Sequence, residues 1–393
     1  MKRYLPSICI PSITKPVTIA ADSISEDYSS RMRNKLGATL SKLPGPVMVT
    51  GHTGFKGSWL TMLLEKLEIS TVGYSLEPEK NSLFERSGIR GHIPEMFADV
   101  RDQSSLERFV LMQKPSCIIH MAAQPLVLES YKNPRQTFDV NVMGTVNLLE
   151  ISRKYDFIQS VVVVTTDKVY RNNNSGQRFV ETDPLGGKDP YSASKVAAES
   201  AVTSWQQISR VHGGPRVLAV RAGNVIGGGD LAENRLIPDL VRSILINKED
   251  VVIRNPDSTR PWQHALDPLR GYLLALEASL IGRTEDSYNF APDGDSISVK
   301  EVAEKFISLA GSKLNLRVVH AEKNLEASIL NLDATRAKKE LQWENFWTQS
   351  EAINQSIAWW LNTINSQASP LEACNEEIEM LLKNSNLKEE HMQ

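Results

Sequence analysis

The 393-residue sequence has few of the residues that mark several protein classes. Its three cysteines, Cys9, Cys117 and Cys374, are scattered and form no C-x-x-C pair, which argues against a disulfide framework or a zinc site and favours a reducing, cytosolic compartment. The net charge of −3 provides no basic field for nucleic acid or a membrane surface. None of the seven histidines pairs with another at ligand spacing, so we predict no metal. Small-molecule chemistry is the better expectation.

The sequence also lacks long apolar runs. No stretch reaches the roughly 18 apolar residues of a membrane-spanning helix. Within residues 1–44, prolines at positions 6, 11 and 16 interrupt the apolar stretches, so a signal-peptide core is absent. This segment is basic and serine-rich, as organelle-targeting peptides are, but its acidic residues count against that interpretation. We expect a flexible extension over residues 1–44 and a polar tail over 363–393.

The most informative stretch is an apolar run followed by closely spaced glycines, Val47 to Gly57. The apolar run predicts a strand, and the apolar spacing over residues 59–67 predicts a helix behind the glycines. Gly51 and Gly54 can adopt positive φ and let the backbone approach a pyrophosphate, while Gly57 permits close packing of helix on strand. The spacing G-x-x-G-x-x-G differs from the common G-x-G-x-x-G, so an ordinary strand-to-helix turn is the alternative. We interpret the stretch as a dinucleotide-binding loop.

Apolar strands alternate with helical patterns after the glycine loop. Continuous apolar runs predict buried parallel strands, here at 71–75, 95–98, 116–120 and 160–165. Helical periodicity covers 103–113, opened by a capping-box pattern from Ser104 to Glu107, and 137–155. The alternation predicts an α/β fold with a Rossmann-like, doubly wound parallel sheet.

The ends of three predicted strands bear on the cofactor. The second strand ends in Tyr74-Ser75-Leu76, with neither the acidic residue that binds the ribose of NAD nor a cation for the 2′-phosphate of NADP, so it selects neither. Asp99, after the third strand, could accept a hydrogen bond from adenine or could cap a turn. The fourth strand ends in His120-Met121-Ala122-Ala123-Gln124, whose small residues could leave room for a flat cofactor or could form a tight turn.

Two polar clusters follow the fifth strand. Thr166, Asp167 and Lys168 come directly after the valine-rich strand, where such folds place chemistry, and they could form an acid/base cluster or a surface loop with an incidental ion pair. Tyr191 and Lys195 stand one helical turn apart. The ammonium would favour the phenolate and lower the pKa of the tyrosine toward that of a useful base. An isolated Y-x-x-x-K is usually a solvated helix pair.

The C-terminal half offers donors for a diphosphate. Asn224, the 227–229 glycine run and Arg260 carry amide, backbone and guanidinium donors, with a turn and a surface ion pair as the alternatives. Trp262 and His264 could line a nucleotide pocket, although buried tryptophan is the more frequent situation. The patterns predict a smaller α/β lobe, with the site between the lobes. Its helices are expected at 236–247, 266–280, 299–309 and 350–361 and its strands at 251–253, 288–290 and 316–319, while the helix-like stretch 371–383 has no assignable role.

Together these motifs resemble the extended short-chain dehydrogenase/reductases that act on nucleotide sugars. The shared motifs are T-G-x-x-G-F-x-G at 50–57, D-V at 99–100, H-x-A-A at 120–123 and Y-x-x-x-K at 191–195. Within that family the chain looks like the branch of CDP-glucose 4,6-dehydratases. The matching motifs are G-H-T-G-F-K-G at 51–57, T-D-K at 166–168, D-P-L-G-G-x-D-P-Y-S-x-S-K at 183–195, R-A-G-N-V-I-G-G-G-D at 221–230, R-L-I-P-D at 235–239 and R-N-P-x-x-T-R-P-W-Q-H at 254–264.

The resemblance covers residues 45–362 and implies two lobes. An NAD-binding Rossmann domain is implied over 45–223, with 265–290 returning to it, and a nucleotide-sugar lobe over 224–264 and 291–362. The implied NAD-binding residues are Gly51, Thr53, Gly54, Phe55, Lys56, Gly57, Asp99, Val100, Ala122, Ala123, Tyr191 and Lys195. The implied substrate-binding residues are Gln124, Asn224, Arg235, Leu236, Arg254, Arg260 and Asn289.

The resemblance also implies the roles of the catalytic residues. Tyr191 would be the base for oxidation at sugar C4, Lys195 would hold the nicotinamide ribose, and Thr166 would hydrogen-bond the C4 hydroxyl. Asp167 and Lys168 stand where related dehydratases have Asp-Glu, which leaves the base at C5 open.

The implied reaction converts CDP-glucose to CDP-4-keto-6-deoxyglucose through bound NAD, and we expect it in the cytoplasm. The resemblance also implies a homodimer whose subunits pair through the helix after the fourth strand and the Tyr191 helix. A dehydratase for another nucleotide sugar or a C4 epimerase shares the fold, but an epimerase needs no acid to expel the C6 hydroxyl. A non-catalytic NAD-binding regulator and a dimeric scaffold are alternatives of a different class.

Overall fold

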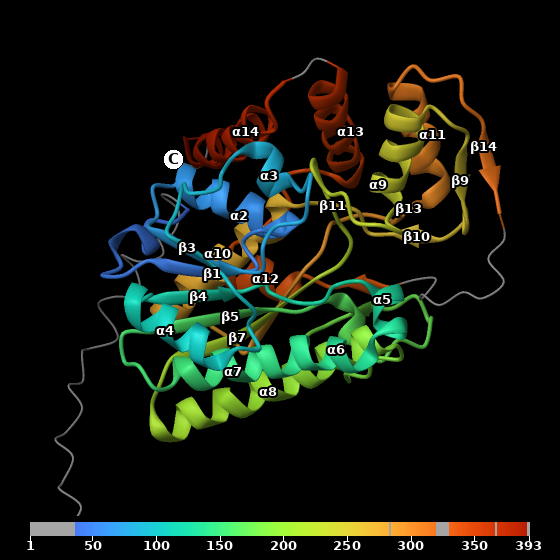
Figure 1. The fold of residues 1–393 in the computed structure, drawn as a ribbon. Helices are drawn as coiled ribbons and strands as arrows, with labels where there is room; N and C mark the ends of the chain where they lie inside the picture. The colour runs from blue at the N-terminus through green and yellow to red at the C-terminus, as the bar shows by residue number, and fades with distance from the viewer. Residues whose placement is uncertain (1–35, 283, 320–329, 366–367, 391–393) are drawn as a thin grey trace, which may run out of the picture.

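The structure is a computed structural model that describes residues 36–282, 284–319, 330–365 and 368–390 (Figure 1). Its centre is a seven-stranded, all-parallel sheet with the order β12-β7-β5-β4-β1-β2-β3. Strand order reverses between β1 and β4, which is where such sheets bind ligands. The strands are β1 (Val47–Thr50), β2 (Thr71–Ser75), β3 (Glu95–Phe97), β4 (Cys117–His120), β5 (Ser160–Val164), β7 (Arg216–Ala222) and β12 (Ser287–Phe290).

Helices cover both faces of the sheet, so the predicted doubly wound architecture is confirmed (Figure 1). Alternate residues of each strand point to opposite faces, and Val47 and Val49 accordingly join one buried cluster while Met48 joins the other. One face carries α2 (Phe55–Lys66) and α10 (Leu266–Leu280), and the other carries α4 (Gln103–Gln113), α7 (Gly144–Ser152) and α8 (Pro190–His212).

Two helix boundaries differ from the sequence prediction. The predicted capping box from Ser104 to Glu107 is wrong. Asp102 caps α4 instead, by accepting a hydrogen bond from the backbone N–H of Ser105 at 3.0 Å. The helix expected over 137–155 is instead α6 (Pro134–Phe138), a π-helical turn at Asp139–Met143, and α7. Such turns inside helices often mark functional sites, and the side chain of Asn141 in this one binds the Gln124 backbone and the Ser194 hydroxyl.

A smaller group of helices and strands is formed by later segments of the chain. Its parallel pair β9–β14 and antiparallel pair β10–β13 flank two helical segments (Figure 1). These elements are α9 (Leu236–Leu240), which continues as a π-helical turn at Val241–Asn247, β9 (Val251–Ile253), β10 (Thr259–Arg260), β13 (Ile297–Ser298), α11 (Val299–Leu309) and β14 (Leu316–Val318).

Short strands and helices connect the two lobes. β8 (Val225–Ile226) pairs in parallel with β11 (Gln263–His264), and β6 (Arg178–Phe179) pairs in parallel with β15 (Asn331–Leu332). The short helix α12 (Thr335–Leu341) contacts α10 and β12.

Both ends of the described chain pack more closely than the sequence suggested. The Glu277 carboxylate of α10 accepts hydrogen bonds from the backbone N–H groups of Gly37 and Thr39, and Leu40 is buried, so residues 36–44 lie against the domain. The first 35 residues of the expected extension lie outside the described residues.

The expected polar tail contains an ordered helix. Helix α13 (Gln349–Asn365) is followed by α14 (Pro370–Glu390), which contacts α2 and α3 (Leu83–Ser87). Cys374, Ile378 and Leu381 are buried on one face of α14. This spacing is helical, but nothing in the local sequence indicates which surface the face covers.

Candidate active site

The glycine loop lies between β1 and α2, at the switch point of the sheet. Gly51 has a φ of +73°, and a β-carbon there would lie 2.8 Å from the backbone nitrogen of Ala122. A β-carbon on Gly57 would lie 2.1 Å from the carbonyl oxygen of Gly51, so only glycine allows helix and loop to approach this closely. Gly54 corrects one expectation: its φ is −74°, and it serves as the exposed N-cap of α2.

The histidine of the H-x-A-A motif joins the two strands that flank the switch point. His120 is buried, with its Nδ1 2.7 Å from the Thr50 hydroxyl and its Nε2 3.2 Å from the Thr145 hydroxyl. Burial lowers the pKa of His120 to about 3, so the ring is neutral. The Thr50 hydroxyl also accepts hydrogen bonds from the backbone N–H groups of Met121 and Ala122, which fixes the turn that carries Ala122 to the crevice.

The end of β2 carries a hydroxyl pair in place of an acid. Thr53 Oγ1 lies 2.7 Å from Ser75 Oγ and donates to the Leu76 carbonyl at 3.1 Å. The Asp99 carboxylate pairs with Arg101, whose hydrogen bonds hold the pKa of that carboxyl below its usual range. This geometry supports the turn-forming role of Asp99, and its contact with adenine stays a prediction. The neighbouring Val100 is buried against α7.

The five predicted catalytic residues gather at the carboxyl end of β5. Thr166 donates to Asp167 Oδ1 at 2.9 Å, and Lys168 Nζ lies 4.0 Å from the same oxygen. The side chain of Asp167 is only 3% exposed and that of Lys168 is 24% exposed, so the carboxyl lies inside and the ammonium at the rim. Tyr191 and Lys195 are buried beside them, and Lys195 Nζ donates to the Val164 carbonyl at 3.1 Å.

A capped helix start fixes Tyr191. Asp189 and Ser192 form a reciprocal capping box, and Pro190 occupies the first helical position of α8. The backbone N–H of Tyr191 donates to Ser130 Oγ at 3.1 Å. The Ser194 hydroxyl accepts a hydrogen bond from the Asn141 side chain, which ties α8 to the π-helical turn. The tyrosine therefore sits on a rigid first turn.

The electrostatics of Tyr191 differ from the sequence prediction. Burial raises the pKa of its phenol. Two effects oppose this by lowering the pKa: the charge of Lys168, which has the largest effect of the nearby cations, and a hydrogen bond with Thr166. The expected effect of Lys195 is not the leading one, because the ammonium of Lys195 is directed to the Val164 carbonyl. Burial also lowers the pKa of Lys195 to about 8, opposed by the charge of Glu199.

A lysine of the glycine loop reaches the same cluster. Lys56 Nζ lies 3.4 Å from the phenol oxygen of Tyr272 on α10. Burial lowers the pKa of Lys56 to about 7, aided by repulsion from Lys195 and Arg235 and opposed by Asp167. Sequence reasoning missed Tyr272, because a tyrosine in an apolar helix carries no motif. The cofactor loop and the acid/base cluster therefore form one electrostatic unit.

Three of the predicted substrate residues lie beside this unit. Arg235 pairs with Asp230 at 2.9 Å, and its charge lowers the pKa of Tyr191. Leu236 follows it as the first residue of α9. Asn224 comes directly after Gly223, whose added β-carbon would lie 3.1 Å from Asp167 Oδ2.

Asn289 is a correction to the expected substrate contact. It is fully buried at the β12 strand, where its side-chain oxygen accepts from the Tyr170 hydroxyl at 2.8 Å. Its side-chain nitrogen donates to the carbonyls of Phe179 and Asp333 at 2.9 and 3.2 Å. These bonds occupy the amide group within the core.

The 227–229 glycines also differ from expectation, because they serve packing. All three are buried. A β-carbon on Gly228 would overlap the indole of Trp359, and the Gly228 carbonyl accepts from Trp59 Nε1 at 3.0 Å. The run therefore allows aromatic side chains to approach the backbone and offers no open phosphate cradle. Trp262 is likewise a core residue, with its Nε1 donating to the Ile297 carbonyl at 3.0 Å.

The remaining predicted substrate residues are less directly placed. The amide of Gln124 hydrogen-bonds to the backbone of Leu126 in its own turn and donates to the Thr137 hydroxyl of α6. Arg254 is exposed at the end of β9, and Arg260 lies in β10, half-buried. Their contacts with substrate stay predictions.

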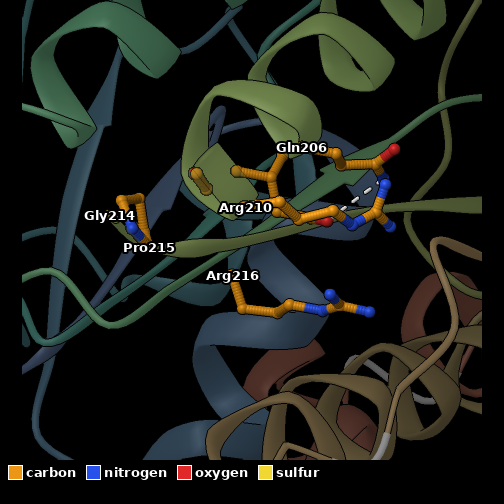
Figure 2. Close-up of a pocket in the computed structure, with 7 residues that line it drawn as sticks. Gln206, Arg210, Gly214, Pro215 and Arg216 are labelled. Atoms are coloured by element: carbon orange, nitrogen blue, oxygen red, sulfur yellow. Dashed lines mark hydrogen bonds between the residues drawn. The ribbon is translucent and has the colours of Figure 1, made fainter. Parts of the chain in front are cut away.

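A separate pocket lies at the far end of α8 (Figure 2). Gln206, Arg210 and Arg216 line it, near the start of β7 and therefore at the opposite edge of the sheet from the catalytic cluster. Arg210 Nη2 lies 2.6 Å from one carboxylate oxygen of Asp286, and Arg216 Nε donates to the Thr284 hydroxyl at 3.1 Å. Both guanidinium groups are thus engaged within the protein.

Membrane-spanning helices are absent from the described ranges, whose helices are too short or too polar to traverse a bilayer. In the same part of the chain, no group of three or more His, Cys, Asp or Glu residues is placed to hold a metal ion.

Comparisons with known proteins agree with this arrangement. The family described as GDP-mannose 4,6 dehydratase matches residues 48–356. A CDP-glucose 4,6-dehydratase from Salmonella typhimurium is 39% identical over 322 residues, covering 80% of this chain and 89% of that protein. A dTDP-glucose 4,6-dehydratase from Haemophilus influenzae is 25% identical over 346 residues, covering 82% of this chain and 99% of that protein.

Solved structures show the same fold. The dTDP-glucose 4,6-dehydratase of Bacillus anthracis, in complex with NAD, superposes with a TM-score of 0.70 at 24% identity and covers 83% of this chain and 99% of its own. The UDP-glucose 4-epimerase of Thermotoga maritima, with UDP-glucose, has a TM-score of 0.70 at 20% identity and covers 81% of this chain and 99% of its own. At this identity the likeness shows the fold alone.

Proposed function

The chain belongs to the GDP-mannose 4,6-dehydratase family, and within it we propose that the protein is a CDP-glucose 4,6-dehydratase that uses bound NAD. The observation that supports this most is the cluster of Thr166, Asp167 and Lys168 beside the buried Tyr191. The relative that carries the name CDP-glucose 4,6-dehydratase covers most of this chain. The product would be CDP-4-keto-6-deoxyglucose and water.

The crevice above β1 and β4 fits a dinucleotide. Gly51 allows its backbone to approach Ala122, and Gly54 presents the N-terminus of α2 to solvent, as an anionic pyrophosphate requires. Residues 51–57, with Ala122 and Lys195, would hold NAD. Once bound, NAD would supply the hydride acceptor for sugar C4 and the donor for C6, so the net redox change is zero.

Tyr191 is the group placed to take the proton of the C4 hydroxyl. Its raised pKa means that the phenol is protonated at neutral pH in this state, and the ammonium of Lys168 is the main charge that favours the phenolate. Thr166, which hydrogen-bonds Tyr191, can bridge to the same hydroxyl. Charges on the bound ligands would therefore change the pKa of Tyr191 and with it the ability of its phenol to take a proton.

Loss of water needs an acid at C6 and a base at C5. Asp167 is nearly buried, so a proton on its carboxyl could be delivered to the leaving C6 hydroxyl with little competition from solvent. Lys168 could remove the C5 proton as a neutral amine or could stabilise the enolate-like charge as an ammonium. The 4.0 Å separation from Asp167 is compatible with both roles.

A substrate comparison tests the proposal. The purified protein is offered CDP-, dTDP-, UDP- and GDP-glucose in parallel, with NAD added, and the 4-keto product is measured. We expect the highest kcat/KM with CDP-glucose. A preference for another nucleotide would refute the CDP assignment, and absence of turnover with every sugar would favour a non-catalytic NAD-binding regulator.

We further propose a cytoplasmic homodimer. Phe138 and Met143, in the helical run before α7, are 38% and 49% exposed, and apolar groups on that face would be covered by a second copy. The scattered cysteines suit a reducing compartment. A monomer mass in light scattering would refute the dimer.

A further inference from the structure

The C-terminal helix α14 lies across the helix that carries the phosphate loop (Figure 1). It contacts α2, α3 and α13. The family match ends at residue 356, so α14 lies beyond the matched region. The buried residues on one face of this helix are Ala373, Cys374, Glu377, Ile378 and Leu381.

Glu377 is the only charged residue among those buried residues, and it faces a histidine. Its Oε2 lies 2.9 Å from Nε2 of His264 in β11, and both side chains are at most 5% exposed. His264 Nδ1 accepts a hydrogen bond from the backbone N–H of Leu266, so Nε2 is the ring nitrogen that contacts the carboxylate. A buried carboxylate requires such a partner. The pair therefore joins α14 to β11.

His264 in turn contacts the start of α2. A β-carbon on Gly227 would lie 3.5 Å from His264 Nε2 and 3.3 Å from Cζ of Phe55, so this glycine lies between the two rings. His264 also packs edge-on against Trp59, with ring centroids 5.5 Å apart. Phe55 is the first residue of α2, and Trp59 lies one turn further along. Contacts thus run from Glu377 through His264 and Trp59 to α2, the helix that follows the phosphate loop.

We propose that Glu377 is a positioning residue for the cofactor. By fixing His264 against Trp59, it holds the N-terminal turns of α2 in the geometry that binds the pyrophosphate of NAD. The inference rests on the proposed use of NAD. Coupling through packed side chains changes binding by roughly 0.5–2 kcal/mol, which corresponds to about a threefold to thirtyfold change in affinity.

Other contacts hold α14 in place without Glu377. Lys66 of α2 pairs with Glu379 at 3.0 Å. On the inner side of α14, Cys374, Ile378 and Leu381 are buried. Loss of one carboxylate therefore leaves the helix docked and alters the position of His264.

The test measures NAD affinity in the full chain by titration calorimetry. Glu377→Ala should raise the Kd for NAD by about threefold to thirtyfold, while kcat at saturating NAD stays within about twofold of the wild type. Glu377→Gln should rescue affinity, because its amide has the shape of the carboxylate and keeps a polar oxygen beside His264. Glu376→Ala, at the exposed neighbouring position, is the matched control and should bind NAD as the wild type does.

Several outcomes would overturn the proposal. An unchanged Kd in Glu377→Ala, or a loss of kcat with unchanged Kd, would show that Glu377 does not position the cofactor loop. Failure of the wild type to bind NAD would instead refute the proposed function. If the alanine variant does not fold, Glu377→Met keeps the apolar packing, and hydrogen exchange at residues 51–58 in the free protein should be faster than in the wild type. Unchanged exchange there would overturn the proposal.

Discussion

Lys168 is the residue whose replacement separates the two mechanisms left open at C5. The Nζ atom of Lys168 lies 4.0 Å from Asp167 Oδ1. Among the nearby cations, the Lys168 ammonium has the largest effect in lowering the pKa of Tyr191. Two unit charges about 4 Å apart, at an effective dielectric constant of about 20, interact with an energy of about 4 kcal/mol. Because the side chain is 24% exposed, solvent screening reduces this to about 1–3 kcal/mol, or roughly tenfold to a hundredfold in rate.

The assay compares Lys168→Met with Lys168→Arg. Methionine removes the charge and should lower kcat/KM by about tenfold to a hundredfold. Arginine keeps the charge but cannot act as a base, so the C5 hydrogen of recovered sugar should still exchange with deuterated solvent if the role of Lys168 is electrostatic. Loss of that exchange in Lys168→Arg would show that Lys168 is the base. A kcat/KM of Lys168→Met equal to that of the wild type would refute both roles.

Three further predictions concern the same cluster. Tyr191→Phe should lower kcat/KM by about a hundredfold or more, because phenylalanine cannot accept the C4 proton, and calorimetry should show unchanged affinity for CDP-glucose. Asp167→Asn should abolish the 4-keto product yet leave C5 deuterium exchange measurable by NMR, because an amide cannot protonate the leaving hydroxyl; product at the wild-type rate would contradict this acid role. The pKa of Lys195 is about 8, so its ammonium predominates below that pH, and kcat/KM should fall as pH rises through about 8; a flat profile from pH 7 to about 9 would refute this assignment.

The sheet and the catalytic cluster could be predicted because their signals are local. Val47 to Gly57 shows both the strand and the glycine turn, and the predicted second strand, residues 71–75, matches β2. The strand pattern placed Thr166 at the carboxyl edge of the sheet, whereas the family resemblance placed Tyr191 in the same site.

The errors arose where a residue depends on a partner far away in the sequence. Gly228 belongs to a glycine run of the kind found in phosphate loops, but Trp359 packs on it from a helix more than a hundred residues later. Asn289 lies near the end of β12, where the resemblance implied a substrate contact, yet Tyr170 and Asp333 bind its amide in the core. Tyr272 lies within an apolar helix, where no spacing indicates that its hydroxyl approaches Lys56.

Product analysis in deuterated water decides whether this chain removes water from CDP-glucose. The purified full chain is incubated with NAD and CDP-glucose, and the sugar is examined by mass spectrometry and NMR. We expect CDP-4-keto-6-deoxyglucose carrying solvent deuterium at C5. Recovery of CDP-galactose, the C4 epimer, or of unchanged CDP-glucose without deuterium would contradict it.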